Sequence, residues 1–394
     1  MRMPNARSAH PLLQHGFRPF FLAAALWAPV SLAIWVLALA DGTALPTALP
    51  LPAWHPHELL FGYTGAVVAG FLLTAVPNWT GRLPVRGLPL LVLCLVWLAA
   101  RLAGLTGGAL SPWPAVVLDV GFWLLLVTAM AREILTGRNW RNLPVVVLAT
   151  LLGGACLLSQ LEALGFASGP VGRRLGLAVV WVLIGMIGGR VVPSFTRNWL
   201  AKRAAPALPA PFGRLDRLAL AVLPVALATW VAFPDGAPAG AMLTLAGAVT
   251  LLRLARWQGL ATTAEPLVTI LHLGYGWLGA GLLLLGLGIL LPNSVGRLAT
   301  LHALSAGAIG TMTLAIMTRA TLGHTGRDLT ADRITLVLFG LVQAGALVRV
   351  VAPVLPAAYS DTLALAAILW GGAFLLFVGR YGPMLVGSRV TGPG

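Results

Sequence analysis

Long apolar stretches, separated by short polar and basic segments, dominate the hydropathy pattern of this chain. A helix that crosses a bilayer needs about 20 largely apolar residues. Stretches of this kind lie at residues 18–40, 57–77, 88–108, 113–133, 143–163, 173–193, 215–233, 239–257, 265–291, 297–318, 334–352 and 361–380. They do not alternate polar and apolar residues as the strands of a membrane β-barrel do. The pattern predicts an all-α, polytopic integral membrane bundle of about twelve transmembrane helices.

The composition agrees with a membrane protein. Of the 394 residues, 58% are hydrophobic and 9% are charged, whereas soluble domains carry about 25% charged residues. A water-soluble surface cannot be built from so few charges. The net charge of +15 does not favour nucleic acid as a partner, because the basic residues cluster between apolar segments, where they set membrane topology. We therefore expect the lipid bilayer, and no nucleic acid, as a partner.

The basic residues also predict the orientation of the chain. With the N-terminus in the cytoplasm, 21 of the 26 Lys and Arg fall on that side, which predicts that both termini are cytoplasmic. A basic, Pro-rich cytoplasmic loop between Arg190 and Arg217 would join two six-helix halves, about 1–193 and 215–394. We find no convincing sequence repeat between these halves, so we predict one transmembrane domain over residues 1–394.

Histidines are the main candidates for chemistry. Ionisable residues inside a membrane are costly and usually functional, and five of the seven His lie in or beside predicted spans. Their depths give an outer layer of His55, His57 and His302 and an inner layer of His272 and His324. Neutral imidazole binds both haem iron and copper, so the pattern indicates a redox or gas-handling metal centre. A hydrogen-bonded packing or interfacial role is the alternative for each.

The segment from His55 to Glu58 opens the second span. Pro56 between the two His suits the first turn of a helix, where both imidazoles are able to converge. We expect the Glu58 carboxylate to accept the other N–H of one imidazole and so fix its tautomer, as metal sites require. The absence of a Cys-x-x-Cys-His motif argues against c-type haem.

Four arginines at helix ends are candidate partners for haem propionates, because Arg binds carboxylates in a bidentate geometry. Arg101 and Arg349 lie near outer helix ends, and Arg190 and Arg319 near inner ones. The alternative is that each side chain snorkels to lipid headgroups. Asp119 is the one acid well inside a predicted span, and Arg101 is its expected partner at similar depth.

Several long blocks resemble the signature of the NnrS family of bacterial membrane proteins, which is associated with the nitric oxide response and denitrification. The blocks are residues 16–21 (GFRPFF), 54–63 (WHPHELLFGY), 70–82 (GFLLTAVPNWTGR), 189–196 (GRVVPSFT), 271–275 (LHLGY), 302–312 (HALSAGAIGTM) and 318–327 (TRATLGHTGR). They cover nearly the whole chain. Leu59 departs from the family, which more often has Met there, and this weakens a copper role for that position.

The resemblance implies a multi-pass protein of the bacterial inner membrane that binds haem and copper and acts on nitric oxide to limit nitrosative stress. It implies a ligand pool of His55, His57, His272, His302 and His324, and we take the haem to be b-type. Which of these histidines bind haem and which bind copper is open. Haem in the outer layer would use His57 and His302, with Arg101 or Arg349 at the propionates. The reverse assignment places haem on His272 near Arg190 and Arg319.

Two classes of function stay open at this point. As an oxidoreductase, the protein would consume nitric oxide and would need a quinol or another electron donor. As a non-enzymatic protein, it would sense nitric oxide or transport haem, copper or another metal. The scarcity of carboxylates in the predicted spans favours binding or transport, because it offers no evident path for protons.

Overall fold

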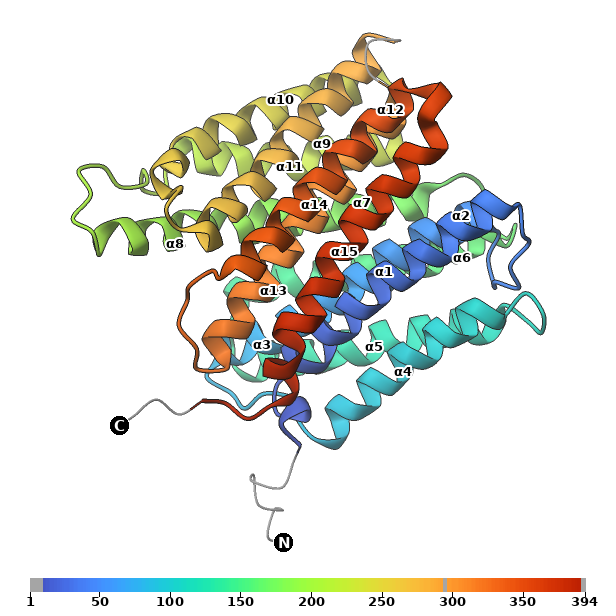
Figure 1. The fold of residues 1–394 in the computed structure, drawn as a ribbon, viewed down its shortest axis with the longest axis horizontal. Coiled ribbons are helices and arrows are strands. Elements are labelled where there is room, and N and C mark those ends of the chain that lie inside the picture. The colour runs from blue at the N-terminus through green and yellow to red at the C-terminus, as the bar shows by residue number, and fades with distance from the viewer. Residues whose placement is uncertain (1–9, 293–295, 391–394) are drawn as a thin grey trace, which may run out of the picture. The chain divides into compact units, whose positions relative to one another are not determined.

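The computed structural model describes residues 10–292 and 296–390, and the regular elements in these ranges are all helices (Figure 1). Twelve helical segments are long and apolar enough to cross a membrane, which confirms the predicted all-α bundle. They are Phe17–Asp41, Leu51–Thr80, Leu88–Thr106, Trp113–Thr136, Trp140–Ala163, Val171–Ala201, Arg214–Ala232, Ala237–Ala255, Pro266–Leu290, Arg297–His324, Arg333–Val354 and Pro356–Val386. The cytoplasmic placement of the termini stays a prediction.

Contacts divide the chain into two compact units. Unit 1 comprises Met1–Gly176, Met317–Asp328 and Phe377–Gly394, and unit 2 comprises Leu177–Ile316 and Leu329–Leu376. The single transmembrane domain predicted from the sequence stays a prediction.

Unit 1 is built around its first helices. The elements are α1 (Phe17–Asp41), α2 (Leu51–His57), η2 (Glu58–Tyr63), α3 (Thr64–Thr80), α4 (Leu88–Thr106), α5 (Trp113–Thr136) and α6 (Leu143–Ala163). Helix α1 packs along α3 and η2, and α5 packs against α4, α6 and α3. The side chains that η2 and α5 direct inward are therefore enclosed by helices of the same unit.

Unit 2 holds most of the remaining helices. They are α7 (Val171–Leu183, which begins in unit 1), η4 (Ile184–Gly188), α8 (Gly189–Ala201), α9 (Arg214–Ala232), α10 (Ala237–Ala255), α11 (Pro266–Leu290), α12 (Arg297–His302), η6 (Ala303–Ile309), α13 (Gly310–His324), α14 (Arg333–Val351) and α15 (Tyr359–Val386). The last residues of α13 and α15 belong to unit 1. Helix α10 packs against α9 and α11, and η6 lies against α11 and α14.

Three spans contain a π-helical segment, in which the backbone is wider than an α-helix. These segments are η2, η4 and η6. Segment η2 begins directly after His57, and η6 begins directly after His302. Because π-helices are rare and occur most often at functional sites, their positions draw attention to the same histidines that the sequence singles out.

A buried ion pair stabilises unit 2 beside the π-helix η4. The Arg253 side chain is 1% exposed, and its Nε donates to Asp216 Oδ1 over 2.8 Å. The terminal guanidinium nitrogens donate to the carbonyl oxygens of Gly185 and Gly189 and to the Tyr275 hydroxyl. Arg253 therefore ties α10 to η4, α8, α9 and α11 at once.

We expect Asp216→Ala to destabilise the protein strongly, because it leaves the Arg253 charge buried without its carboxylate. Removing one partner of a buried pair costs about 3–5 kcal/mol. Asp235→Ala is the matched control, since Asp235 is 68% exposed in its pair with Arg297 and such surface pairs contribute about 0–1 kcal/mol. Thermal unfolding in detergent should show a large drop for the first variant alone; equal effects would contradict the structural role of Arg253.

Candidate metal centre

A cluster of buried charged side chains lies in the middle of unit 1. Glu58 and Arg101 are 1% exposed and Asp119 is 3% exposed. The Arg101 Nη1 donates to Glu58 Oε2 over 2.6 Å, and its Nη2 donates to Asp119 Oδ1. The Trp27 indole N–H also donates to Glu58 Oε2, over 2.8 Å. Helices α1, η2, α4 and α5 therefore meet through charged or polar side chains at this point.

Glycines make room for the cluster. A Cβ atom at Gly62 would lie 2.7 Å from Arg101 Nη1, and one at Gly104 would lie 3.1 Å from Glu58 Oε1. The Gly62 carbonyl oxygen accepts a hydrogen bond of 3.1 Å from the Trp97 indole. Because Gly62 belongs to η2, the π-helix and the close approach of the guanidinium are parts of one local arrangement.

His57 completes the cluster and is 4% exposed. Its Nε2 lies 3.0 Å from Asp119 Oδ2. An ionised carboxylate only accepts hydrogen bonds, so Nε2 carries the proton. In the neutral ring Nδ1 then carries the lone pair, and this atom is buried without a hydrogen-bond partner in the described structure. Histidine ligands of metals are held in this way, with the second N–H donated to a carboxylate.

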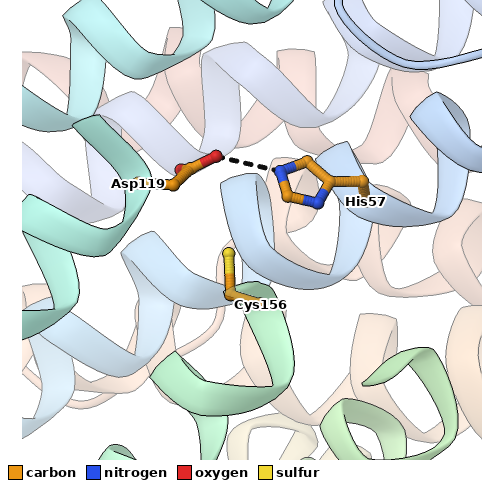
Figure 2. A group of neighbouring side chains, drawn as sticks. All are labelled: His57, Asp119 and Cys156. Atoms are coloured by element: carbon orange, nitrogen blue, oxygen red, sulfur yellow. Dashed lines mark hydrogen bonds and ion pairs between the residues drawn. The ribbon is translucent and has the colours of Figure 1, made fainter. Parts of the chain in front are cut away.

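Cys156 brings a sulfur atom to the same place. It is fully buried on α6, and its Sγ, a His57 ring nitrogen and an Asp119 carboxylate oxygen all lie within 4.8 Å of one another. Figure 2 shows the three side chains converging from three helices. The Gln160 amide donates to Cys156 Sγ over 3.6 Å. In the described residues this is the group of His, Cys, Asp and Glu close enough to hold a metal ion.

The charges of the cluster do not balance without a further cation. Glu58 and Asp119 carry two negative charges, and Arg101 carries one positive charge. An uncompensated charge is costly in a buried site. Either a proton on His57 or a bound metal cation would supply the missing positive charge.

The donor atoms fit copper. Soft thiolate and imidazole ligands select copper, zinc and iron–sulfur clusters, whereas carboxylate-rich sites suit harder ions. His57 Nδ1 has no hydrogen bond, Cys156 Sγ accepts a long one from Gln160, and the Asp119 oxygens accept charged or short ones from His57 and Arg101. We therefore take His57 Nδ1 and Cys156 Sγ as the donors most readily available to an ion. Asp119 is therefore placed to orient the His57 ring and not to bind the ion itself.

Two predicted ligands of unit 2, the buried His272 and the half-buried His302, are also each held by one hydrogen bond. His272 is 7% exposed, and its Nε2 lies 2.8 Å from Thr196 Oγ1, whose own proton goes to the Val192 carbonyl. His272 Nδ1 therefore carries the lone pair and has no described partner. His302 Nδ1 donates to the Leu298 carbonyl over 2.8 Å, which leaves its Nε2 lone pair for a ligand.

The remaining predicted ligands have different surroundings. The His55 ring stacks on Trp35 with ring centroids 4.0 Å apart. His324 is exposed at the end of α13, and its ring lies 5.3 Å from that of Phe17 in unit 1. The predicted pairings of His57 with His302, and of His272 with His324, each join a residue of unit 1 to a residue of unit 2, and they stay predictions.

The four arginines also differ. Arg101 donates hydrogen bonds to the carboxylates of Glu58 and Asp119. Arg349 on α14 is 8% exposed, and its Nη1 is buried with no hydrogen-bond partner in the described ranges. Arg190 is exposed on α8, and Arg319 is half-buried on α13. Arg101 Nε is also buried without a partner, but both terminal nitrogens of Arg101 already bind carboxylates, whereas Arg349 has a buried terminal nitrogen open to a carboxylate of haem.

One expectation from the sequence is confirmed and another is wrong. Arg101 pairs with Asp119, as their similar depths predicted. Glu58 was expected to accept from an imidazole, but it accepts from Trp27 and Arg101 instead, and Asp119 holds His57. The reason is that Glu58 begins the π-helix, where Arg101 fills the space above Gly62.

Cys156 was not recognised as a site residue. A single Cys in an apolar span is usually a small buried hydrophobe, and nothing near it in the sequence marks it otherwise. Its contact with Asp119 and His57 depends on the packing of α6 against α5 and α2.

The fold and the cluster define a multi-pass membrane protein with a buried site of His, Cys and carboxylate groups. The family model described as NnrS protein matches residues 11–389, nearly the whole chain, so the chain belongs to the NnrS family. This makes it a membrane protein related to the nitric oxide response. A search of curated proteins finds no match.

The charge balance of the cluster predicts unequal effects for two substitutions. Arg101→Met leaves two carboxylates buried without their cation and should cost about 3–5 kcal/mol. Asp119→Asn keeps Arg101 paired with Glu58 and offers His57 an amide oxygen, but it turns the amide NH2 toward Arg101 Nη2, so it should cost about 1–3 kcal/mol. Thermal unfolding of both variants in detergent tests this order. Similar losses for the two would show that the cluster does not carry excess negative charge.

Proposed function

We propose that the protein binds copper and haem in the bacterial inner membrane and acts on nitric oxide. The observation that carries the copper assignment is the buried group of His57, Cys156 and Asp119, whose ligand atoms lie within 4.8 Å of one another. Membership of the NnrS family supports the link to nitric oxide and the association with haem and metal.

In this proposal the residues of unit 1 have separate tasks. His57 Nδ1 and Cys156 Sγ hold the ion, Asp119 fixes the tautomer of His57, and Arg101 keeps Asp119 ionised and in place. Glu58 holds Arg101 from the other side. Bound copper would supply one-electron redox chemistry and a binding position for nitric oxide. The apolar helices around the cluster exclude water, which favours a small uncharged ligand such as nitric oxide over ions.

The haem belongs in unit 2 under this proposal. His302 and His272 each keep one ring nitrogen free of hydrogen-bond donors, and the haem iron binds such a nitrogen. Arg349 supplies a buried guanidinium nitrogen without a partner. The haem would be b-type, because the chain has no Cys-x-x-Cys-His sequence for covalent attachment.

Two activities fit this composition of metals. The first is reduction of nitric oxide, which needs electrons from a quinol or another donor and protons at the site. The second is non-enzymatic binding, either to sense nitric oxide or to transport haem, copper or another metal. The three ionisable groups that adjoin His57 are already paired with one another, and this favours binding over repeated proton delivery.

Nitric oxide consumption separates these activities. Purified protein in vesicles, given a quinol and nitric oxide in excess, should remove only about one equivalent for each metal site if it binds. Steady loss over many equivalents, dependent on the quinol, would establish the reductase instead. Uptake of copper into vesicles without such loss would support transport.

Copper content should depend on Cys156 and His57. We expect Cys156→Ser and His57→Ala to lower the affinity for copper(I) at least about tenfold, since even the partners of ligands contribute about 10–100-fold. Metal analysis after anaerobic purification with a competing chelator measures this. Cys94→Ser is the matched control, because Cys94 lies on α4 of the same unit and is only half-buried. Equal copper in all three variants would refute the assignment.

A further inference from the structure

Two segments of the chain share one sequence pattern. Residues 57–82 and 302–327 align without a gap and are identical at eight of 26 positions. The identical pairs are His57/His302, Leu59/Leu304, Gly62/Gly307, Gly65/Gly310, Ala75/Ala320, Thr80/Thr325, Gly81/Gly326 and Arg82/Arg327. The histidine and the Thr-Gly-Arg triplet are informative, because the chain has only seven His. The segments belong to the second and tenth spans, so a comparison of the two six-helix halves does not align them.

The two segments also have the same local structure. In each, a short helix ends at the histidine, a π-helix begins at the next residue, and a long α-helix follows. The glycine of each Thr-Gly-Arg triplet has a positive φ, of 70° at Gly81 and 76° at Gly326. A π-helix in the same place is unlikely to arise twice by chance, because this conformation is rare.

The preceding helix packs in the same way in both cases. A Cβ atom at Gly62 would lie 3.0 Å from Trp27 Nε1 on α1, and one at Gly307 would lie 2.6 Å from Trp277 Cδ2 on α11. Helices α1 and α11 both have 25 residues. Each therefore places a tryptophan against the equivalent glycine of the π-helix that follows it.

The later helices match as well. A Cβ atom at Gly65 would lie 3.2 Å from Trp123 on α5, and one at Gly310 would lie 2.5 Å from Trp370 on α15. Between them, α4 and α14 both have 19 residues and both begin six residues after the Thr-Gly-Arg arginine. The elements from α1 to α5 and from α11 to α15 are therefore two copies of one four-span repeat.

The two copies differ in charge. Glu58 of the first copy corresponds to Ala303 in the second. Asp119 lies four residues before Trp123, and the residue four before Trp370 is Ala366. The second copy thus has buried alanines, 0% and 3% exposed, at the positions of both carboxylates.

The tryptophan of the second copy also has an uncharged partner. The Trp277 indole donates to the Gln343 amide oxygen over 2.8 Å, whereas Trp27 donates to the Glu58 carboxylate.

The second copy nevertheless keeps an arginine. Arg349 lies on α14, three residues beyond the position that matches Arg101, which is about one helical turn along the same face. It contacts Tyr359, with its Cζ 5.9 Å from the ring centroid, and its helix α14 packs against α12, which ends at His302, and against η6. Its Nη1 is buried and has no hydrogen-bond partner in residues 10–292 and 296–390. The second copy therefore has a cation about one helical turn from the equivalent position, but it has alanines where the first copy has the carboxylates that neutralise Arg101.

We propose that the second copy of this repeat is an anion site, in which Arg349 binds a carboxylate of a metal chelate whose metal is held by His302 Nε2. Haem has this chemistry, with its propionate at Arg349 and its iron at His302. The first copy, with two carboxylates, takes a cation, and the second, with none, takes an anionic ligand. This inference rests on the haem of the proposed function, and it adds the reason for the positive charge at Arg349 and the choice of His302 over His272 for the iron.

Haemin and haemin dimethyl ester test the proposal, because they share the iron and the ring but only haemin has free carboxylates. Haem-free protein would be titrated with each while the Soret band is followed. Wild type should bind haemin at least about tenfold more tightly than the diester. Arg349→Gln should bind both as wild type binds the diester, and Arg349→Lys should restore part of the preference. Arg333→Gln, which removes an exposed arginine from the same helix, should behave as wild type.

A second variant gives the second copy a carboxylate that the first copy has. Ala303→Glu places a carboxylate where Glu58 stands in unit 1, so it should compete with haemin for Arg349 and leave copper binding unchanged. Thermal unfolding confirms that each variant folds. If Arg349→Gln keeps the wild-type preference for haemin, Arg349 is not the anion site and only this inference fails. If wild type binds neither porphyrin, the haem of the proposed function fails together with it.

Discussion

The Arg101 guanidinium, held between two buried carboxylates, is the interaction on which the site in unit 1 depends. It joins α4 to η2 and α5, and through Asp119 it orients the His57 ring. Two carboxylates and one guanidinium leave a negative charge that a buried site does not tolerate alone. The same feature that stabilises the helices therefore creates a demand for a cation beside the sulfur of Cys156.

The internal repeat explains why the half-buried His302 and the buried Arg349 occur in one set of helices, as His57 and Arg101 do in another. Duplication preserves the backbone, including the π-helix and the tryptophans that pack on its glycines. Under our proposal, the two exchanges of carboxylate for alanine reverse the charge of the ligand that the second copy attracts. One four-span repeat would then serve two cofactors of different charge.

The sequence predicted the twelve helices well, because each membrane span carries its own hydrophobic signal. It also predicted the pairing of Arg101 with Asp119, since depth within a span follows from residue number. It did not predict that Asp119 rather than Glu58 holds His57, or that Cys156 joins them. These contacts depend on which faces of α2, α5 and α6 meet. In a span that is apolar on all sides, no periodic pattern in the sequence indicates which residues face a neighbouring helix. The repeat gives only a weak sequence signal, because its copies are eight spans apart and keep few identical residues.

X-ray absorption at the copper edge of the purified wild-type protein tests the central claim most directly. The account predicts a copper ion bound by at least one sulfur atom together with imidazole nitrogen, and loss of the sulfur signal in Cys156→Ser. A copper ion surrounded by nitrogen and oxygen alone, or an unchanged sulfur signal in that variant, would contradict the proposed site in unit 1.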